Sequence, residues 1–413
     1  KFLNQLKTEE HRLRSKEANS FLNLKDYCEA EGFKGWDPYD GLNSRLFRAT
    51  GLQHWDFARL AWIQAFKRNP VNLRGVLAVP KQYNAKGVGL FLSGYCKLYR
   101  IAENEYNAYG SKKELLKKIH FLANLLEELQ SKGYSGACWG YNFDWQARGG
   151  LFFPAHTPTV VATTFCATAL SEAYEITGEK KYLDIVLSSV DFILKDLSRT
   201  PHNSGFLFSY SPLKGNNTVY NASLLGAKLL SIAYRYTGNE DYKSVAREAI
   251  NAACEGQGKD GSWIYGLLPI QSWKDSFHTG YNLDAIQAYQ DNTGDSSFQS
   301  NIDKGFKFYI NNFFEADGTP KYYHDKTYPI DIHCPGQLFV TLAALNRFDE
   351  HKELAEKVMK WTIENMQDWK GYFYYQLKRG VSSKISYMRW SNAFMFNAMS
   401  SYLLAQEKKT NAV

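Results

Sequence analysis

The residues YEITGEKKYLD (174–184) contain a turn signature that recurs as YRYTGNEDYKS (234–244) and YQDNTGDSSFQS (289–300). The glycines of the three copies are separated by 60 and 56 residues, and a degenerate copy at 345–357 continues the series. Glycine accepts positive φ past the end of a helix, and acidic residues favour the first turn of the next helix. Each copy therefore predicts a short turn between two helices, and the repeat predicts an array of helical hairpins.

The helices on the two sides of each turn differ in character. The segments before the turns are apolar and rich in Ala, Gly, Ser and Thr: 157–178, 218–238 and 278–294. The segments after the turns are amphipathic, with apolar residues at i, i+3, i+4 and i+7: 181–198, 241–253 and 351–366. Buried inner helices are therefore expected to alternate with half-exposed outer helices.

Long connections, dense in Gly, Trp and Tyr, lead from each outer helix back to the next inner one. They span 29–41, 131–150, 198–217, 256–276, 315–333 and 366–390. One inner helix after each connection gives six hairpins, the first inner helix starting at WDPYDGLNSR (36–45). An additional apolar helix at 89–103, paired with 112–130, would make seven.

We predict an all-α fold, an (α/α)6 or (α/α)7 toroid, formed by residues 1–413 as one domain. An open solenoid is the alternative, but the distinctive connections recur on one side only, which favours a closed ring. No Pro/Ser-rich linker divides the chain, and residues 1–30 are expected to form a helix that packs on the ring.

Composition limits the possible partners. The 413 residues carry a net charge of +7, and aromatic residues make up 15%. The apolar content excludes a disordered chain, and no run of about 18 apolar residues predicts a membrane-spanning helix. Modest positive charge suits an anionic partner, a slightly basic surface being the plainer alternative; no nucleic-acid motif is present.

The six cysteines are scattered and show no paired spacing, so we expect reduced packing residues in a cytoplasmic protein. The even count leaves disulfides as an alternative. The N-terminal residues lack the apolar stretch and cleavage site of a signal peptide, although a signal removed earlier would leave no trace.

The aromatic connections mark the expected functional face. They lie where the N-termini of all inner helices gather, so backbone amides and partial positive charge point at whatever binds there. Trp and Tyr offer flat surfaces for sugar rings and groups for hydrogen bonding. The alternative is that these aromatic residues only pack the loops together.

The segment DSFHTGYNLDAIQ (275–287) carries the first group of candidate catalytic residues. His278, Tyr281 and Asn282 fall at i, i+3 and i+4 and so share one face at the start of an inner helix. Asp275 precedes them as a candidate carboxylate, with a helix N-cap as the alternative role.

The segment preceding the inner helix at 157–178 carries a second group. Asp144 lies between aromatic residues, which would raise its pKa and suit it as an acid, unless it pairs with Arg148 in the loop. His156 is expected to point into the cleft. The candidate catalytic residues are thus Asp144, His156, Asp275, His278 and Tyr281. The candidate substrate-binding residues are Trp36, Asp40, Trp139, Tyr141, Trp145, Arg148, Tyr210, Trp263, Asn282, His333, Tyr375, Arg389 and Trp390.

The motifs that other toroid enzymes use to bind metals or cofactors are incomplete or missing in this sequence. Asp331, His333 and Cys334 in PIDIHCPG could join His278 around zinc, but their spacing matches neither protein prenyltransferases nor lanthionine cyclases, which are zinc toroids. The aspartate-rich motifs of terpene cyclases, a phosphate-binding loop, GxGxxG, HExxH and GxSxG are all missing from the sequence. We therefore expect neither a metal nor a cofactor.

The repeated TG-acidic turn, the aromatic return loops and the small-residue inner helices resemble the α/α-toroid carbohydrate-active enzymes over residues 30–405. These enzymes include six-hairpin glycosidases, toroidal polysaccharide lyases and the helical domain of glucuronyl C5-epimerases. GYFYYQLKRG (371–380) followed by YMRWSNAFMFNAMSSYLL (387–404) looks most like the epimerase domain. The β-rich domains that lyases and epimerases commonly carry are missing from this sequence.

The resemblance implies processing of an oligo- or polysaccharide, with two competing chemistries. A glycosidase needs two carboxylates, which Asp144 with Asp275 or Asp331 would supply. A uronate lyase or epimerase needs a base, Tyr281 or His278, and cations such as Arg148 and Arg389 to neutralise the sugar carboxylate. A glycan-binding or scaffold protein without catalysis is the remaining alternative.

Overall fold

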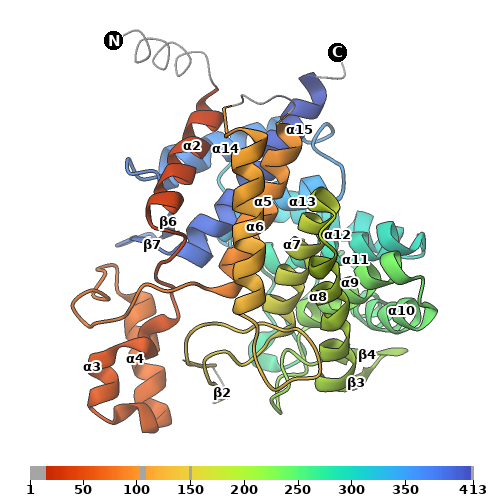
Figure 1. The fold of residues 1–413 in the computed structure, drawn as a ribbon, viewed down its shortest axis with the longest axis horizontal. Helices are drawn as coiled ribbons and strands as arrows, with labels where there is room; N and C mark the ends of the chain where they lie inside the picture. The colour runs from red at the N-terminus through yellow and green to blue at the C-terminus, as the bar shows by residue number, and fades with distance from the viewer. Residues whose placement is uncertain (1–14, 103–107, 148–150, 411–413) are drawn as a thin grey trace.

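The computed structural model describes residues 15–102, 108–147 and 151–410 (Figure 1). Arg148 and the first 14 residues lie outside this part of the chain. Six apolar helices form the inner layer: α5 (Ala85–Ile101), α7 (Val160–Thr177), α9 (Tyr220–Thr237), α11 (Ser276–Thr293), α13 (His333–Ala344) and α15 (Phe394–Thr410). Each packs against the next, and α15 packs against α5, so the inner layer closes on itself. The α/α toroid expected from the repeats is confirmed.

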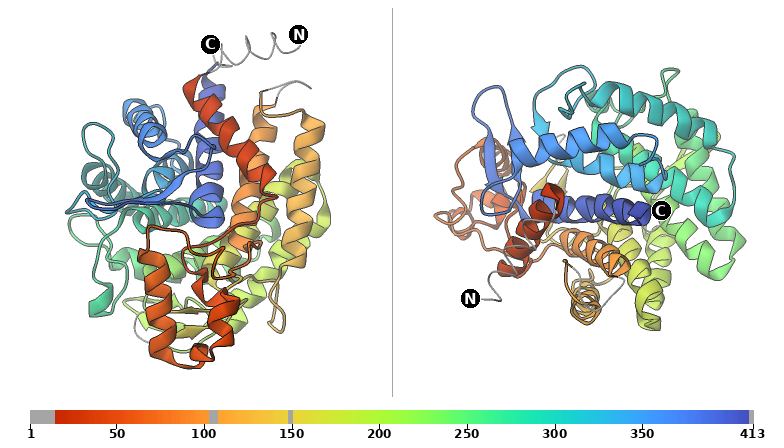
Figure 2. Two further views of the ribbon diagram at one scale, coloured as in Figure 1. Left: turned by 90° about the vertical axis from the view of Figure 1, so that its left-hand side faces the viewer. Right: turned by 90° about the horizontal axis from the view of Figure 1, so that it is seen from above.

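An outer helix accompanies each inner one. The outer layer comprises α6 (Lys112–Glu128), α8 (Lys180–Asp191), α10 (Glu240–Glu255), α12 (Gln299–Phe313), α14 (Lys352–Met366) and α2 (Lys16–Ala30). The last pair joins the two ends of the described chain, because α2 packs against α15 and α14. Seen from above, the colours run in chain order around the ring (Figure 2).

The described residues therefore form six hairpins, and the expectation that an inner helix begins at 36–45 is wrong. This region instead begins an excursion outside the ring (Figure 1). It contains η1 (Asp40–Asn43), α3 (Arg45–Ala49), η2 (Leu52–His54) and α4 (Asp56–Arg68). The first inner helix is α5, which the sequence presented as a supernumerary apolar helix.

The repeated turn has the predicted conformation. Gly178, Gly238 and Gly294 end their helices with φ of 68°, 66° and 73°. The preceding threonine reinforces the turn: the hydroxyl of Thr177 donates to the Ala173 carbonyl and accepts from the backbone N–H two residues later. These bonds satisfy backbone groups that a helix end leaves unpaired, so the turn is defined locally.

Small residues explain why α5 lies in the inner layer. A Cβ on Gly89 would lie 3.3 Å from Cα of Cys166 on α7, and a Cβ on Gly94 would lie 2.4 Å from the ring of Phe396 on α15. Glycine is therefore needed where α5 meets each of its inner neighbours. Larger side chains of the same helix, such as the fully buried Phe91, fill the core between layers.

Short strands stiffen the long connections. β1 (Trp145–Gln146) pairs with β2 (Phe152–Phe153), and β3 (Arg199–His202) pairs with β4 (Gly205–Phe208). β5 (Ile330–Asp331) joins β6 (Tyr374–Leu377) and β7 (Ser383–Ser386) in a three-stranded antiparallel sheet. This last sheet links two return connections at the same face of the ring.

All six cysteines are buried and unpaired, as expected for packing residues. Among the described residues, no helix combines the length and apolar character that crossing a membrane requires.

Candidate active site

A cluster of polar and aromatic side chains occupies the face where the inner helices begin. Its members, called the central cluster below, are Lys86, His278, Tyr281, His333, Arg389 and Trp390. They come from the starts of α5, α11 and α13 and from η5 (Met388–Ala393), the turn that opens α15. Lys86, Tyr281 and His278 contact one another in turn, as do Arg389, Trp390 and His333. Phe277 lies between the two groups and contacts both, so return connections far apart in sequence converge on one place.

Asp275 and His278 form a hydrogen-bonded pair at the start of α11. Asp275 is the N-cap of the helix, and its Oδ1 accepts the backbone N–H of His278 at 3.0 Å. Its Oδ2 lies 2.9 Å from Nδ1 of the same histidine and accepts the indole N–H of Trp273, also at 2.9 Å. The carboxylate therefore fixes the orientation of the imidazole and leaves Nε2 for another partner. The side chain of His278 is 21% exposed, whereas that of Asp275 is fully buried.

Lys86 is a buried amine with no carboxylate partner among the described residues. Its Nζ lies 3.3 Å from the hydroxyl of Tyr281 and 4.3 Å from the ring centroid of Phe165. Burial, together with the nearby Arg389, holds the pKa of Lys86 well below its usual value. Burial also raises the pKa of Tyr281 well above its usual value, so this phenol keeps its proton.

His333 stacks on Trp390, with ring centroids 4.2 Å apart and an interplanar angle of 5°. The ring is buried, and neither of its nitrogens has a hydrogen-bond partner among the described residues. Burial and neighbouring cations hold the pKa of His333 well below its usual value, so the ring is neutral. Phe277 touches both rings and also His278, which joins this part of the cluster to α11.

Asp331, next to this stack, is entirely buried. It accepts hydrogen bonds from the Trp390 indole at 2.8 Å, the Gln376 amide at 2.6 Å and the backbone N–H of His333 at 3.0 Å. Burial raises the pKa of Asp331 to about 6. Three donors and complete burial make it a support for the stack rather than a group that meets a ligand.

Arg389 joins the central cluster to the start of the excursion. Its Nε and one terminal nitrogen donate to the two carboxylate oxygens of Asp37 at 2.5 and 2.8 Å. The guanidinium lies over the ring of Tyr141, 4.9 Å from its centroid. The Tyr141 hydroxyl lies 3.5 Å from that of Tyr210. Arg389, Tyr141 and Tyr210, which were predicted site residues on three different return connections, therefore lie close together.

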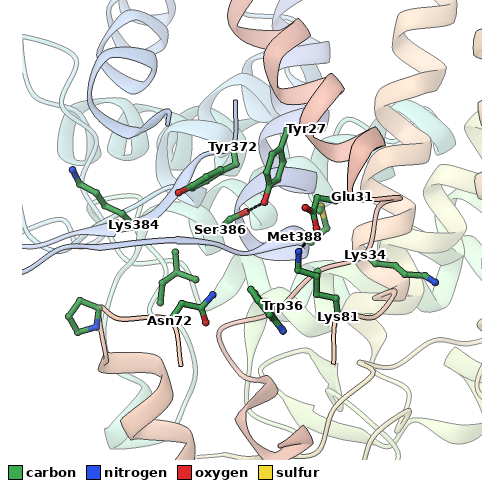
Figure 3. Close-up of a pocket in the computed structure, with 13 residues that line it drawn as sticks. Tyr27, Glu31, Lys34, Trp36, Asn72, Lys81, Tyr372, Lys384, Ser386 and Met388 are labelled. Atoms are coloured by element: carbon green, nitrogen blue, oxygen red, sulfur yellow. Dashed lines mark hydrogen bonds and ion pairs between the residues drawn. The ribbon is translucent and has the colours of Figure 1, made fainter. Parts of the chain in front are cut away.

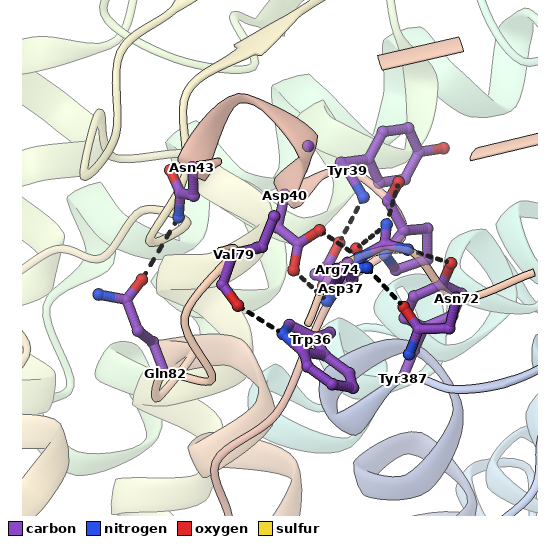
Figure 4. Close-up of polar contacts among 12 residues, drawn as sticks. Trp36, Asp37, Tyr39, Asp40, Asn43, Asn72, Arg74, Val79, Gln82 and Tyr387 are labelled. Carbon is purple, nitrogen blue, oxygen red and sulfur yellow. Dashed lines mark hydrogen bonds and ion pairs between the residues drawn. The ribbon is translucent and has the colours of Figure 1, made fainter. Parts of the chain in front are cut away.

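A second buried arginine fixes the excursion to the ring. Arg74 donates to Asp40 at 2.6 Å and to the hydroxyl of Tyr387 at 2.9 Å, and it also bonds the backbone carbonyl of Asp37 (Figure 4). Burial raises the pKa of Asp40 to about 6, although Arg74 opposes this shift. Asp40 therefore holds the excursion in place and does not line the central cluster.

Half-buried aromatic residues border the cluster. The ring of Tyr265 stacks on that of Trp273, with centroids 4.5 Å apart, and its centroid lies 4.7 Å from that of the His278 ring. Trp145 stacks on Phe153 and meets Tyr210 edge-on. Tyr375, also predicted, packs on Trp390 but is buried. Asn282, directly after Tyr281, is buried, and the oxygen of its side-chain amide has no hydrogen-bond partner among the described residues.

Several predicted site residues lie elsewhere. Trp139 and Trp263 are buried, and their indole N–H groups bond the backbone carbonyls of Leu126 and Ala253, so these rings pack the scaffold. Their positions do not support the predicted contact with a ligand. His156 is exposed in a turn with φ of 65°, and no side-chain contact of it with the central cluster is found among the described residues.

Asp144 is half-buried, and Arg148, the partner that the sequence suggested for it, lies outside the described residues. It accepts the backbone N–H of Ala155 at 2.6 Å and lies 3.6 Å from Arg48 of the excursion. The indole N–H of Trp36 bonds the carbonyl of Val79, and this residue lines a separate pocket described below.

Sequence reasoning missed Lys86 and Asp37. Lys86 occupies the first turn of a glycine-rich helix that is otherwise apolar as far as Leu92, and a charged residue in such a place is a signal for function. Asp37 lies in a WDPYDG loop where turn chemistry was the better explanation of the carboxylate. Within the described residues, no group of three or more His, Cys, Asp or Glu side chains is arranged to hold a metal ion.

Comparison with known proteins places the fold. No family model matches the chain, and no curated protein sequence matches it. The α-mannanase of glycoside hydrolase family 76 from Bacteroides thetaiotaomicron is similar with a TM-score of 0.58 at 14% identity, over 80% of this chain and 87% of that one. The cellobiose 2-epimerase from Bacillus thermoamylovorans gives 0.57 at 13%, over 80% and 90%. An unsaturated glucuronyl hydrolase specific for heparin gives 0.55 at 13%, over 79% and 87%.

These proteins are α/α-toroid carbohydrate-active enzymes, and the present chain has their fold. At sequence identities of 13–14%, this similarity establishes a shared fold but not a shared reaction.

Proposed function

We propose that this protein abstracts a proton from a uronate unit of an anionic saccharide bound at the central cluster, as a lyase or an epimerase does. The observation that carries the proposal is the pair of Asp275 and His278. A histidine whose Nδ1 is held by a buried carboxylate has its other nitrogen available as a base.

In this scheme Nε2 of His278 takes the proton from the carbon next to the sugar carboxylate. The electron pair left behind is delocalised into that carboxylate, which becomes an enolate-like dianion. In elimination, the pair then expels the oxygen at the neighbouring carbon and forms a carbon–carbon double bond. In epimerisation, a proton returns to the same carbon from the opposite side.

Lys86 suits the stabilisation of this charge. It has no carboxylate partner among the described residues, and its surroundings are aromatic. A substrate carboxylate beside Nζ would provide the missing counter-charge and favour the ammonium form. Arg389 is already neutralised by Asp37, so its expected contribution is to position the site and not to bind the anion directly.

Tyr281 suits the role of acid. Its raised pKa keeps the phenol protonated, and its hydroxyl faces Lys86. The phenol would donate its proton to the leaving oxygen or to the opposite side of the carbon. This assignment leaves His278 as the base.

Hydrolysis by two carboxylates receives less support. Asp37, Asp275 and Asp331 are buried, and each accepts at least three hydrogen bonds from side chains or backbone. A glycosidase needs one carboxyl group to donate a proton and a second to act as base or nucleophile at the scissile bond. The two histidines and the unpaired lysine match proton abstraction better.

A panel of uronate-containing and neutral oligosaccharides tests the proposal, with products identified by mass spectrometry, ultraviolet absorbance and, for epimers, NMR. We expect an unsaturated or epimerised product from a uronate substrate only. Fragments whose masses add up to the substrate plus one water molecule would identify a hydrolase. Binding without any product would identify a glycan-binding protein, and either result contradicts the proposal.

A further inference from the structure

The excursion, residues 36–79, carries an unusual share of the exposed apolar side chains. Fifteen large apolar side chains are exposed in the described part of the chain, and seven of them belong to the excursion: Leu46, Leu52, Trp55, Phe57, Val71, Leu73 and Val76. Trp55 is 68% exposed and Phe57 is 83% exposed. Single exposed apolar residues are normal on a protein surface, whereas a group of them marks an interaction site.

These side chains are not part of the excursion's own core. Leu42, Phe47 and Ile63 form that core, and the ring of Phe47 stacks on that of Trp62 with centroids 4.6 Å apart. The buried bonds of Arg74 then fix the excursion to the ring. The exposed apolar side chains therefore lie on a packed and anchored unit.

Four of the seven come from neighbouring elements that project from the ring at the lower left of Figure 1. Leu46 belongs to α3, Leu52 belongs to η2, and Trp55 and Phe57 flank the first residue of α4. Because η2 packs against both α3 and α4, these four residues lie close together. They are called the apolar patch below.

The loop after α4 extends the apolar surface. The backbone N–H of Arg45 donates to the carbonyl of Ala78 at 3.2 Å, and the hydroxyl of Ser44 donates to that of Leu77 at 2.6 Å. The end of the loop, which carries the exposed Val76, is therefore held against the start of α3 and close to Leu46.

The beginning of the same loop has one side toward the ring. Pro70 and Asn72 line a pocket of about 300 Å³, together with Trp36, the end of α2 and β7 (Figure 3). Val71, between them, is exposed and does not line this pocket. Val71 therefore adds to the exposed apolar surface of the excursion and not to the pocket.

The excursion also carries excess positive charge. Residues 44–76 contain six Lys and Arg residues but a single acidic residue, Asp56. Three of the cations have carboxylate partners, in the pairs Arg59–Asp56, Arg74–Asp40 and Arg48–Asp144. Lys67 bonds the hydroxyl of Tyr39, and Arg45 and Arg68 are exposed with no ion pair among the described residues. Arg45 directly precedes Leu46 of the apolar patch.

Exposed Trp, Phe and Leu side chains beside unpaired cations suit a lipid surface that carries negative charge. Apolar side chains insert at the boundary between headgroups and acyl chains, Trp favours this depth, and Lys and Arg are attracted to anionic headgroups. A second copy of this chain suits the patch less well, because a symmetric contact would bring identical cations together.

We propose that the excursion docks this protein onto the surface of a bilayer that contains anionic lipids. The apolar patch inserts among the lipids, and Arg45 contacts their phosphate groups. The inference does not depend on the reaction proposed for the central cluster.

Co-sedimentation with vesicles tests the docking. The probes are vesicles of phosphatidylcholine alone and vesicles of equal parts of phosphatidylcholine and phosphatidylglycerol. We expect the wild type to bind the mixed vesicles at least tenfold more tightly, and Arg45→Ala to weaken this binding about fivefold. Equal binding to both kinds of vesicle, or binding to neither, would overturn the proposal.

Trp55→Ser with Phe57→Ser should weaken binding to the mixed vesicles at least tenfold. Ile270→Ser with Trp369→Ser is the matched control, because these two side chains are also well exposed but lie outside the excursion. Thermal unfolding should be unchanged in both variants. Equal losses of binding in the two variants would overturn the proposal. A dimer in solution that only Trp55→Ser with Phe57→Ser abolishes would assign the patch to a second copy and would overturn it as well.

Discussion

The imidazole Nδ1 of His278 lies 2.9 Å from Oδ2 of Asp275, the residue that also caps the helix carrying the histidine. One carboxylate thus fixes both the start of α11 and the orientation of the ring. Because the pair is three residues apart on one helix, its geometry does not depend on the more distant connections. The contributions of the two residues can therefore be tested by separate substitutions.

His278→Gln should lower kcat about 10²–10⁴-fold, the usual contribution of a general base, with little change in KM. Asp275→Asn should lower kcat less, because the amide still caps the helix but no longer stabilises a protonated imidazole. Steady-state kinetics on the substrate found with the saccharide panel provide the measurement. Unchanged kcat in both variants would remove the pair from the mechanism.

Lys86→Met should change how stability depends on pH. In the wild type, the folded-state pKa of Lys86 lies below the unfolded value of about 10.4. Between these two values the unfolded chain binds more protons, so the free energy of unfolding rises with pH, by at most about 1.4 kcal/mol per pH unit.

Methionine has no such proton, so the variant should lack this rise. Denaturant unfolding at several pH values up to 10 measures the difference, with the exposed Lys180→Met as control. Identical slopes for Lys86→Met and the wild type would show that the lysine is not held in an environment that disfavours its charge.

Arg74→Met should destabilise the protein by about 3–5 kcal/mol, because it leaves the Asp40 carboxylate buried without its counter-charge. The pair of Arg100 and Glu175 is a suitable comparison, because both side chains are well exposed, and Arg100→Met should cost less than about 1 kcal/mol. Both values come from denaturant unfolding. A small effect at Arg74 would mean that the excursion is not anchored through this pair.

Gly178→Ala should cost about 1–2 kcal/mol, because the residue has φ of 68° and an L side chain is strained there. A Cβ would meet no atom within 4 Å, so the cost is conformational only. Gly75→Ala is the control: it has equally open space without positive φ. Equal effects at the two positions would contradict the proposed role of the turn.

Local features account for the part of the fold that the sequence predicted. The TG turn, the small-residue helices and the amphipathic helices each depend on residues close in the chain, and each was found as expected. The number of hairpins was open because WDPYDGLNSR looks like a helix start, whereas the glycines of α5 identify an inner helix only once its neighbours are known.

The site was predictable where spacing along one helix defines it. His278 and Tyr281 share a helical face and do come together. The sequence position of a tryptophan in a loop does not show whether its ring reaches the site. Trp390 belongs to the central cluster, whereas the indole N–H groups of Trp139 and Trp263 bond backbone carbonyls in the scaffold. Lys86 escaped notice because its partners, Phe165 and Tyr281, lie on helices distant in sequence.

Solvent deuterium exchange tests proton abstraction most directly. The protein is incubated in D2O with a uronate oligosaccharide, and the hydrogen next to the sugar carboxylate is followed by NMR in saccharide and product. We predict that the wild type replaces this hydrogen by deuterium or eliminates it, and that His278→Gln does neither. Turnover of the saccharide with that hydrogen fully retained would contradict the account.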